Sequence, residues 1–212
     1  MVAVEIINDF LELLNTNNFK YVLVKNDDNA IPYSVNSNDD IDFLIHPSEY
    51  ERLIEVTTNN GYEKIVGESC KSYFLYQLRD DILLKKEDCY FHFFEALSCT
   101  PLTNMGRCKM ALENDVQRYI WENRVWGSTN NWWIMDDISI LLYLIVRSVF
   151  DKKCFKDKYI REIEKRVNYL ENDSFYMMAK TVFWGFTPQI ISLVKEKRYA
   201  EVLKEYLAYS NY

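Results

Sequence analysis

The stretch SNDDIDFLI, residues 37–45, constrains the fold of this chain more than any other, because it places three acids at the head of an apolar run. If residues 40–45 form a β-strand, successive side chains point to opposite faces. The apolar face, which would pack against the core, then carries Ile41, Phe43 and Ile45. The opposite face carries the carboxylates of Asp40 and Asp42, with Cα atoms roughly 6.6 Å apart. We expect Asp39 to be a turn residue before the strand.

The residues on either side predict a sheet with helices packed on it. Helical spacing of apolar residues predicts a helix over residues 2–14, and FKYVLVK, residues 19–25, predicts a short buried strand. Pro47 predicts the start of a second helix, which Gly61 ends as a C-cap. The strand-like runs that follow are YEKIVGE, KSYFLYQL, DILLKK and YFHFFEAL. We therefore expect a mixed sheet of about five strands.

The character of the chain changes at Asp136. DDISILLYLIVRSVF predicts a buried helix with Asp136 or Asp137 as its N-cap, and helical patterns continue to Tyr212. Residues 107–135 fit either an aromatic hairpin or an irregular connection. The predicted fold class is α+β, with a mixed-sheet domain over residues 1–135 and a helical domain over residues 136–212.

Composition and charge limit the classes of function. The net charge of −7 argues against binding a nucleic-acid backbone, so small-molecule or protein partners are expected. The five cysteines are scattered without a C-x-x-C pair, which argues for reduced thiols and against structural zinc. No apolar run approaches the ~20 residues of a membrane span. The N-terminal segment carries acids in place of a basic signal region, and we expect a cytoplasmic protein.

Two parallel carboxylates at the start of a strand disfavour folding unless a positive group lies between them. Mg²⁺ prefers oxygen ligands of this kind, and a two-metal transfer site takes a third carboxylate from an adjacent strand. Glu95 is the candidate, because it shares a strand face with Phe91 and Phe93. The alternative is a Glu95 at the exposed end of its strand. His92 falls on the other face of that strand and is expected to be a structural or surface histidine.

Four of the five tryptophans lie in YIWENRVWGSTNNWW, residues 119–133, with Arg118 and Arg124 among them. Stacked aromatic rings and arginines can hold a base or a sugar. Packing in a core or a domain seam is the commoner use of such residues, and it is the favoured prediction here.

The order of these motifs carries a family resemblance. YVLVKN, followed by NDDIDFLIHPSEYERLIEVTTNNGYEKI, resembles the nucleotidyltransferase superfamily with the polymerase-β-type fold. In that superfamily one strand carries h-x-D-x-D-h-h-h, where h is apolar, and a later strand supplies a third acid. The pattern is also similar to nucleotidyltransferase-like proteins of bacterial surface-polysaccharide loci. The resemblance covers residues 19–100, with a looser similarity at ILLYLIVRSVFDKKCFKDKYIREI.

The resemblance implies Mg²⁺-dependent (or Mn²⁺-dependent) transfer of a nucleoside monophosphate from a nucleoside triphosphate to a small-molecule or protein acceptor. It makes Asp40, Asp42 and Glu95 the catalytic metal ligands. The residues that it places near the nucleotide phosphates are Lys25, Asn26 and Lys152.

The sequence departs from the family pattern at two points. The superfamily's phosphate-binding Gly-Ser pair has no counterpart, because NDDNAIPYS follows YVLVK. The third acid is a glutamate where aspartate is commoner. The alternative function is therefore a catalytically inactive nucleotidyltransferase-fold module with a binding or regulatory role, such as an antitoxin or scaffold.

Overall fold

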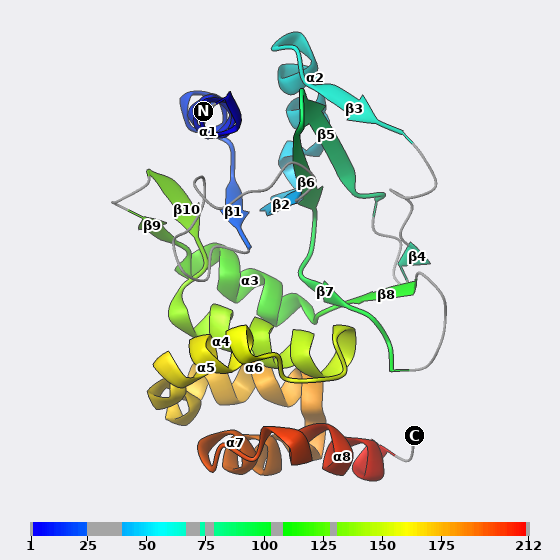
Figure 1. Cartoon of the computed structure of the whole chain (residues 1–212), viewed down its shortest axis with the longest axis vertical. Helices are drawn as coiled ribbons and strands as arrows, with labels where there is room; N and C mark the ends of the chain where they lie inside the picture. Colours follow the sequence, from blue (N-terminus) through cyan, green and yellow to red (C-terminus); the bar gives the residue numbers. More distant parts are fainter. Residues whose placement is uncertain are drawn as a thin grey trace. The chain divides into compact units, whose positions relative to one another are not determined.

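The computed structural model of the 212-residue chain describes residues 2–24, 40–66, 73–74, 79–102, 108–127 and 131–210 (Figure 1). They form two compact units. Unit 1 contains Met1–Leu97 and Arg124–Ile134, and unit 2 contains Ser98–Asn123 and Met135–Tyr212. The sequence predicted one boundary near residue 136, whereas here residues 98–123 group with the C-terminal helices and residues 124–134 return to unit 1.

Unit 1 is built on a seven-stranded mixed sheet with the order β3-β5-β6-β2-β1-β10-β9. Its strands are β1 (Tyr21–Leu23), β2 (Asp40–Ile45), β3 (Glu63–Ile65), β5 (Ile82–Lys86), β6 (Cys89–Phe94), β9 (Val125–Gly127) and β10 (Trp132–Ile134). β2 pairs parallel with β6 and β1 pairs parallel with β10, while the other pairs are antiparallel. The mixed sheet of the predicted α+β class is confirmed. The β9–β10 hairpin, one of the two alternatives for residues 107–135, extends it beyond the five strands expected.

The helices of unit 1 bury an aromatic core against this sheet. They are α1 (Val2–Thr16), the 3₁₀ turn η1 (Pro47–Glu49) and α2 (Tyr50–Asn59). Phe10 of α1 stacks on Phe91 with ring centroids 3.9 Å apart, and Phe43 stacks on Phe93 at 4.7 Å. Gly61, just after α2, has φ +80°, the left-handed conformation that suits a residue ending a helix.

Strand β2 is buried on both faces beyond its first residue. Ile41, Phe43 and Ile45 belong to the core, as the alternation predicted. Leu44 on the other face is also fully buried. The side chain of Asp42 is consequently buried, whereas Asp40 at the start of the strand is exposed.

Unit 2 is mainly helical. Its helices are α3 (Asn114–Asn123), α4 (Asp137–Val146), the π-helical turn η3 (Arg147–Asp151), α5 (Asp157–Lys165), η4 (Val167–Glu171), α6 (Asp173–Phe183), η5 (Trp184–Phe186), α7 (Thr187–Lys195) and α8 (Tyr199–Ser210). Its strands β7 (Ser98–Cys99) and β8 (Cys108–Ala111) pair antiparallel. The short strand β4 (Tyr73–Phe74) belongs to unit 1. None of the described helices is long and apolar enough to cross a membrane.

The aromatic segment before α4 combines a helix and a hairpin. Trp121 lies in α3, and the strands β9 and β10 carry the other three tryptophans. Trp132 is buried in the core, while the rings of Trp126 and Trp133 meet edge to face at 5.2 Å. Arg124 lies over the ring of Trp133, 4.3 Å from its centroid. Trp132 thus has the packing role that the sequence favoured, whereas Trp126 is exposed.

Candidate metal centre

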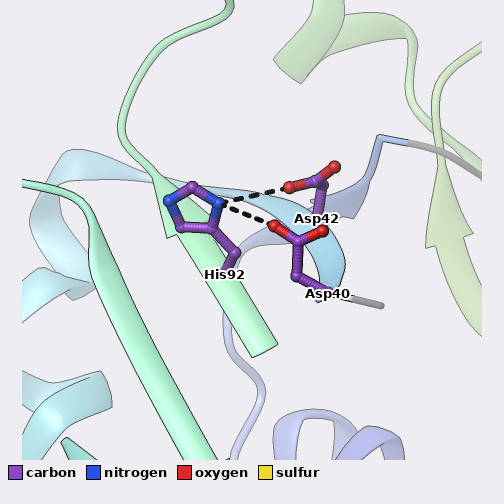
Figure 2. A group of neighbouring side chains, drawn as sticks. All are labelled: Asp40, Asp42 and His92. Carbon is purple, nitrogen blue, oxygen red and sulfur yellow. Dashed lines mark ion pairs between the residues drawn. The ribbon is translucent and has the colours of Figure 1, made fainter. Parts of the chain in front are cut away.

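The register of two parallel strands brings Asp42 and His92 together. β2 and β6 are neighbours, and Asp42 is paired with His92. Paired residues of adjacent strands project to the same face of a sheet, and Asp40 shares that face by alternation. Figure 2 shows the three side chains converging, and one ligand atom from each lies within 4.8 Å of the others.

The distances at this centre join one imidazole nitrogen to two carboxylates. Nδ1 of His92 lies 3.3 Å from Oδ1 of Asp42 and 3.4 Å from Oδ2 of Asp40. The side chain of Asp42 is only 2% exposed, that of His92 is 21% exposed and that of Asp40 is 51% exposed. The centre thus has a buried end at Asp42 and an end open to solvent at Asp40.

A further carboxylate fixes the histidine from its other side. Nε2 of His92 lies 3.1 Å from Oδ2 of Asp81, whose side chain is 3% exposed. Asp81 directly precedes β5, the antiparallel neighbour of β6. A carboxylate accepts hydrogen bonds, so Asp81 favours the tautomer with a proton on Nε2, while Nδ1 faces Asp40 and Asp42.

The spacing of these atoms suits a divalent cation. For metal–ligand bonds of about 2.1 Å, neighbouring ligand atoms lie ~3.0 Å apart in an octahedral shell and ~3.4 Å apart in a tetrahedral one. The two distances from Nδ1 of His92 lie within this range. Three protein ligands leave coordination positions for water or substrate, as catalytic metal sites require. Two of the three ligand pairs therefore have the separation expected around a metal ion, and all three ligand atoms lie within 4.8 Å of one another.

Glu95, the predicted third acid, is not part of this group. It follows β6, and its buried carboxylate forms an ion pair with Nη2 of Arg79. The backbone N–H of Arg79 also donates to Oε2 of Glu95 at 3.4 Å. The guanidinium of Arg79 lies over the ring of Tyr50 and donates to the carbonyl of Pro47. The metal-binding and catalytic roles assigned to Glu95 stay predictions.

The remaining predicted nucleotide contacts lie elsewhere. Lys25 and Asn26 are outside the described residues. Lys152 follows η3 in unit 2, where its side chain is exposed and its backbone N–H donates to the carbonyl of Arg147 at 2.9 Å. Its contact with nucleotide stays a prediction.

His46, the second histidine, has a local structural role. Its Nδ1 caps η1 by accepting a hydrogen bond from the backbone N–H of Ser48 at 3.3 Å, and it also lies 2.8 Å from the Ser48 hydroxyl. Burial lowers the pKa of His46, and the neighbouring positive charge of Lys20 lowers it further.

Comparisons with known proteins give no family assignment. No family model matches the chain, and no curated protein matches it. A solution structure of the antibiotic-resistance factor ANT(2'')-Ia is similar with a TM-score of 0.49 and 9% identity, covering 92% of this chain and 96% of that one. A crystal structure of ANT(2'')-Ia in complex with adenylyl-2''-tobramycin gives a TM-score of 0.49 and 11% identity, covering 85% of this chain and 97% of that one. Structural similarity at this level does not assign a function, so the functional conclusion rests on the side chains of the candidate metal centre.

Proposed function

We propose that this chain is a divalent-metal-dependent nucleotidyltransferase. It would move a nucleoside monophosphate from a nucleoside triphosphate to a small-molecule or protein acceptor. The observation that carries the proposal is the convergence of Asp40, Asp42 and His92 on one face of a mixed sheet. The D-x-D pattern on β2, which resembles that of nucleotidyltransferases, supports the same reaction class. The resemblance to surface-polysaccharide proteins supports a cytoplasmic role in polysaccharide biosynthesis.

The charges at the centre explain why such a reaction needs a cation. Asp40 and Asp42 would repel a triphosphate, so they can serve a phosphoryl transfer only by holding a positive ion. Mg²⁺ or Mn²⁺ bound there would screen the phosphate oxygens and stabilise the charge that develops on them. Asp42 would anchor the ion because its carboxylate is buried in the sheet, while the exposed Asp40 lies where substrate can approach.

The other predicted residues complete the proposal. Lys25 and Asn26 follow β1 in the sequence and would neutralise and orient the triphosphate. Lys152 would add a positive charge from unit 2. Glu95 would take part in deprotonating the acceptor only after release from its ion pair with Arg79.

A loss of carboxylate charge at the centre tests the proposal. Asp42→Asn should abolish transfer from labelled nucleoside triphosphates to a pool of sugar phosphate, amino sugar and protein acceptors, while the circular dichroism spectrum stays unchanged. The matched control is Asp88→Asn, which removes a carboxylate from the exposed turn between β5 and β6. Transfer that survives in Asp42→Asn at the rate of the Asp88→Asn chain would refute the assignment.

A second candidate function is an inactive binding module of the same fold. Its support is the absence of glycine from the sequence between Lys25 and Asp39, where the family has its phosphate-binding pair. A thermal-shift screen of four nucleoside triphosphates with Mg²⁺ or Mn²⁺ separates the two functions. A ligand at a hundred times its dissociation constant should stabilise an enzyme by about 2.7 kcal/mol. No shift with any nucleotide favours the module.

A further inference from the structure

His92 is held between carboxylates on both sides of its ring. Nε2 lies 3.1 Å from Asp81, while Nδ1 lies 3.3 Å from Asp42 and 3.4 Å from Asp40. In the ring tautomer that donates from Nε2 to Asp81, the lone pair of Nδ1 faces the two aspartates. A metal ion bound to Nδ1 and to both aspartates would replace the repulsion between these atoms by attraction.

Burial strengthens the attraction between such an ion and its ligands. Asp42 and Asp81 are almost fully buried, so water screens their charges poorly. A divalent ion would bond to one atom of each of the three converging side chains.

We propose that His92 is a metal ligand through Nδ1, that Asp81 positions it, and that this nitrogen makes the centre select Mn²⁺ over Mg²⁺. The role of the ion in nucleotidyl transfer rests on the proposed function, but the preference for Mn²⁺ belongs to the binding site alone.

The preference follows from the chemistry of the ligands. Mg²⁺ takes oxygen ligands and keeps most of its water, whereas imidazole nitrogen suits first-row transition ions. Two carboxylates and one imidazole therefore form a set that Mn²⁺ accepts more readily than Mg²⁺. Affinity should rise further from Mn²⁺ to Co²⁺, the usual order for such ligands.

The contact between Asp81 and His92 is the kind that accompanies metal-bound histidines. In such sites the ring nitrogen that does not bind the metal donates to a carboxylate, which fixes the tautomer and raises the basicity of the ligand nitrogen. Asp81 makes this contact from a buried position beside β5. Because it contacts the ring nitrogen that does not face the two aspartates, Asp81 is a positioning residue that acts through His92.

The direct test measures metal binding to the full chain without nucleotide. Isothermal titration should give a dissociation constant for Mn²⁺ at least tenfold lower than that for Mg²⁺. Co²⁺ should produce weak visible bands typical of nitrogen and oxygen ligands, without the intense near-ultraviolet band of thiolate coordination. Asp42→Asn should remove both signals. Equal affinities for Mn²⁺ and Mg²⁺, or a thiolate band that survives Asp42→Asn, would overturn the proposal.

Variants of the histidine and its partner separate ligation from mere packing. His92→Gln keeps an amide N–H that can donate to Asp81 but replaces the nitrogen ligand with an oxygen. We expect it to weaken Mn²⁺ binding by about 10–100-fold, the range for disturbed histidine ligation, and to change Mg²⁺ binding less than about threefold. Asp81→Asn should weaken Mn²⁺ binding over the same range. The matched control is His46→Asn, which leaves the centre intact and should change neither affinity.

Thermal unfolding in a chelator shows whether each variant is folded before titration. A Mn²⁺ preference that persists in both His92→Gln and Asp81→Asn would contradict the proposal. Because these measurements use no triphosphate, their outcome is separate from that of the transfer assay. A protein that prefers Mn²⁺ but transfers no nucleotide would contradict the proposed function alone. A protein that is active with Mg²⁺, and whose metal affinities do not change in His92→Gln, would contradict this inference alone.

Discussion

At the scale of single residues, Arg79 interacts with two glutamates in different surroundings. Its partner Glu95 has a side chain only 6% exposed, whereas Glu51, whose Oε1 lies 3.5 Å from Nη1, is 80% exposed. An ion pair in solvent adds little to stability, but a buried carboxylate that loses its cation keeps its full desolvation penalty. The same arginine therefore makes one pair that matters for stability and one that does not.

This contrast gives the first prediction. Glu95→Gln should lower the free energy of unfolding by about 1–3 kcal/mol, because the charge-assisted hydrogen bond from Arg79 to a carboxylate becomes a weaker one to a neutral amide. Glu51→Gln should leave it nearly unchanged. Urea unfolding of the two variants measures the difference, and the transfer assay decides the role of Glu95. If turnover per folded molecule falls in Glu95→Gln, Glu95 has a catalytic role. If turnover per folded molecule is unchanged, the role of Glu95 is structural.

The sequence was sufficient to place Asp40 and Asp42 but not His92. Alternation along one strand gave the shared face of the aspartates, and it correctly put His92 on the face opposite Phe91 and Phe93. Alternation along a single strand does not show which strands are neighbours, so it did not predict the pairing of β2 with β6. The signal was present, because Phe43 and Phe93 are both core residues and pair in the sheet. Matching those apolar faces puts the residues on the other faces, Asp42 and His92, side by side.

At the scale of elements, α4 begins where the sequence placed it. Asp136 is the N-cap, and its Oδ1 accepts from the backbone N–H of Ser139 at 3.0 Å. An N-cap aspartate satisfies a donor that the first turn leaves unpaired, which is a local effect that sequence reveals well. The hairpin β9–β10 was harder to predict, because β10 pairs with β1 from more than a hundred residues away.

The cap yields the second prediction. Asp136→Ala should destabilise the chain by about 1 kcal/mol, since the N–H of Ser139 loses its acceptor. Asp136→Asn keeps an acceptor oxygen at the same position, so its stability should be close to that of the parent chain. Thermal unfolding measured by circular dichroism compares the two. An equal loss in both variants would assign the effect to the charge of Asp136, which also lies 3.3 Å from the hydroxyl of Tyr119.

The carboxylate of Glu162 on α5 yields a pH-dependent prediction. Burial opposes its ionisation, but hydrogen bonds from Lys165 and Arg166 outweigh burial and lower its pKa. A pKa that is lower in the folded chain stabilises it above the unfolded value of about 4.3, and this contribution is lost as pH falls through the folded value. The parent chain should therefore lose more stability than Glu162→Gln between pH 6 and pH 3.

Urea unfolding across this pH range measures the difference between the two chains. Glu171→Gln is the matched control, because Lys195 also lowers the pKa of Glu171 but that pair is exposed to solvent. The pH dependence of the free energy of unfolding of Glu171→Gln should be closer to that of the parent chain than the pH dependence of Glu162→Gln is. Parallel profiles for the parent and Glu162→Gln would show that the buried pair contributes nothing to acid stability.

At the scale of the whole molecule, the chain crosses between its two units more than once. Residues 98–123 belong to unit 2, yet the following residues 124–134 complete the sheet of unit 1. The sequence predicted a single crossing, because composition changes sharply only at Asp136. A short helix such as α3, with Val116 and Ile120 as its buried residues, has no compositional mark that assigns it to one core or the other.

The crossings make a prediction about which piece folds alone. A chain of residues 1–135 keeps the whole sheet but deprives α3 of its unit, so Val116 and Ile120 should be exposed and the dye ANS should bind. A chain that joins Leu97 to Arg124 through a flexible Gly/Ser linker, and ends at Met135, omits α3 and should bind ANS less. All four residues of the candidate centre lie in unit 1, so the linked chain should retain Mn²⁺ binding within about tenfold of the full chain. If the linked chain binds ANS as strongly as the 1–135 chain, or loses Mn²⁺ binding, unit 1 depends on the helices of unit 2 for its fold.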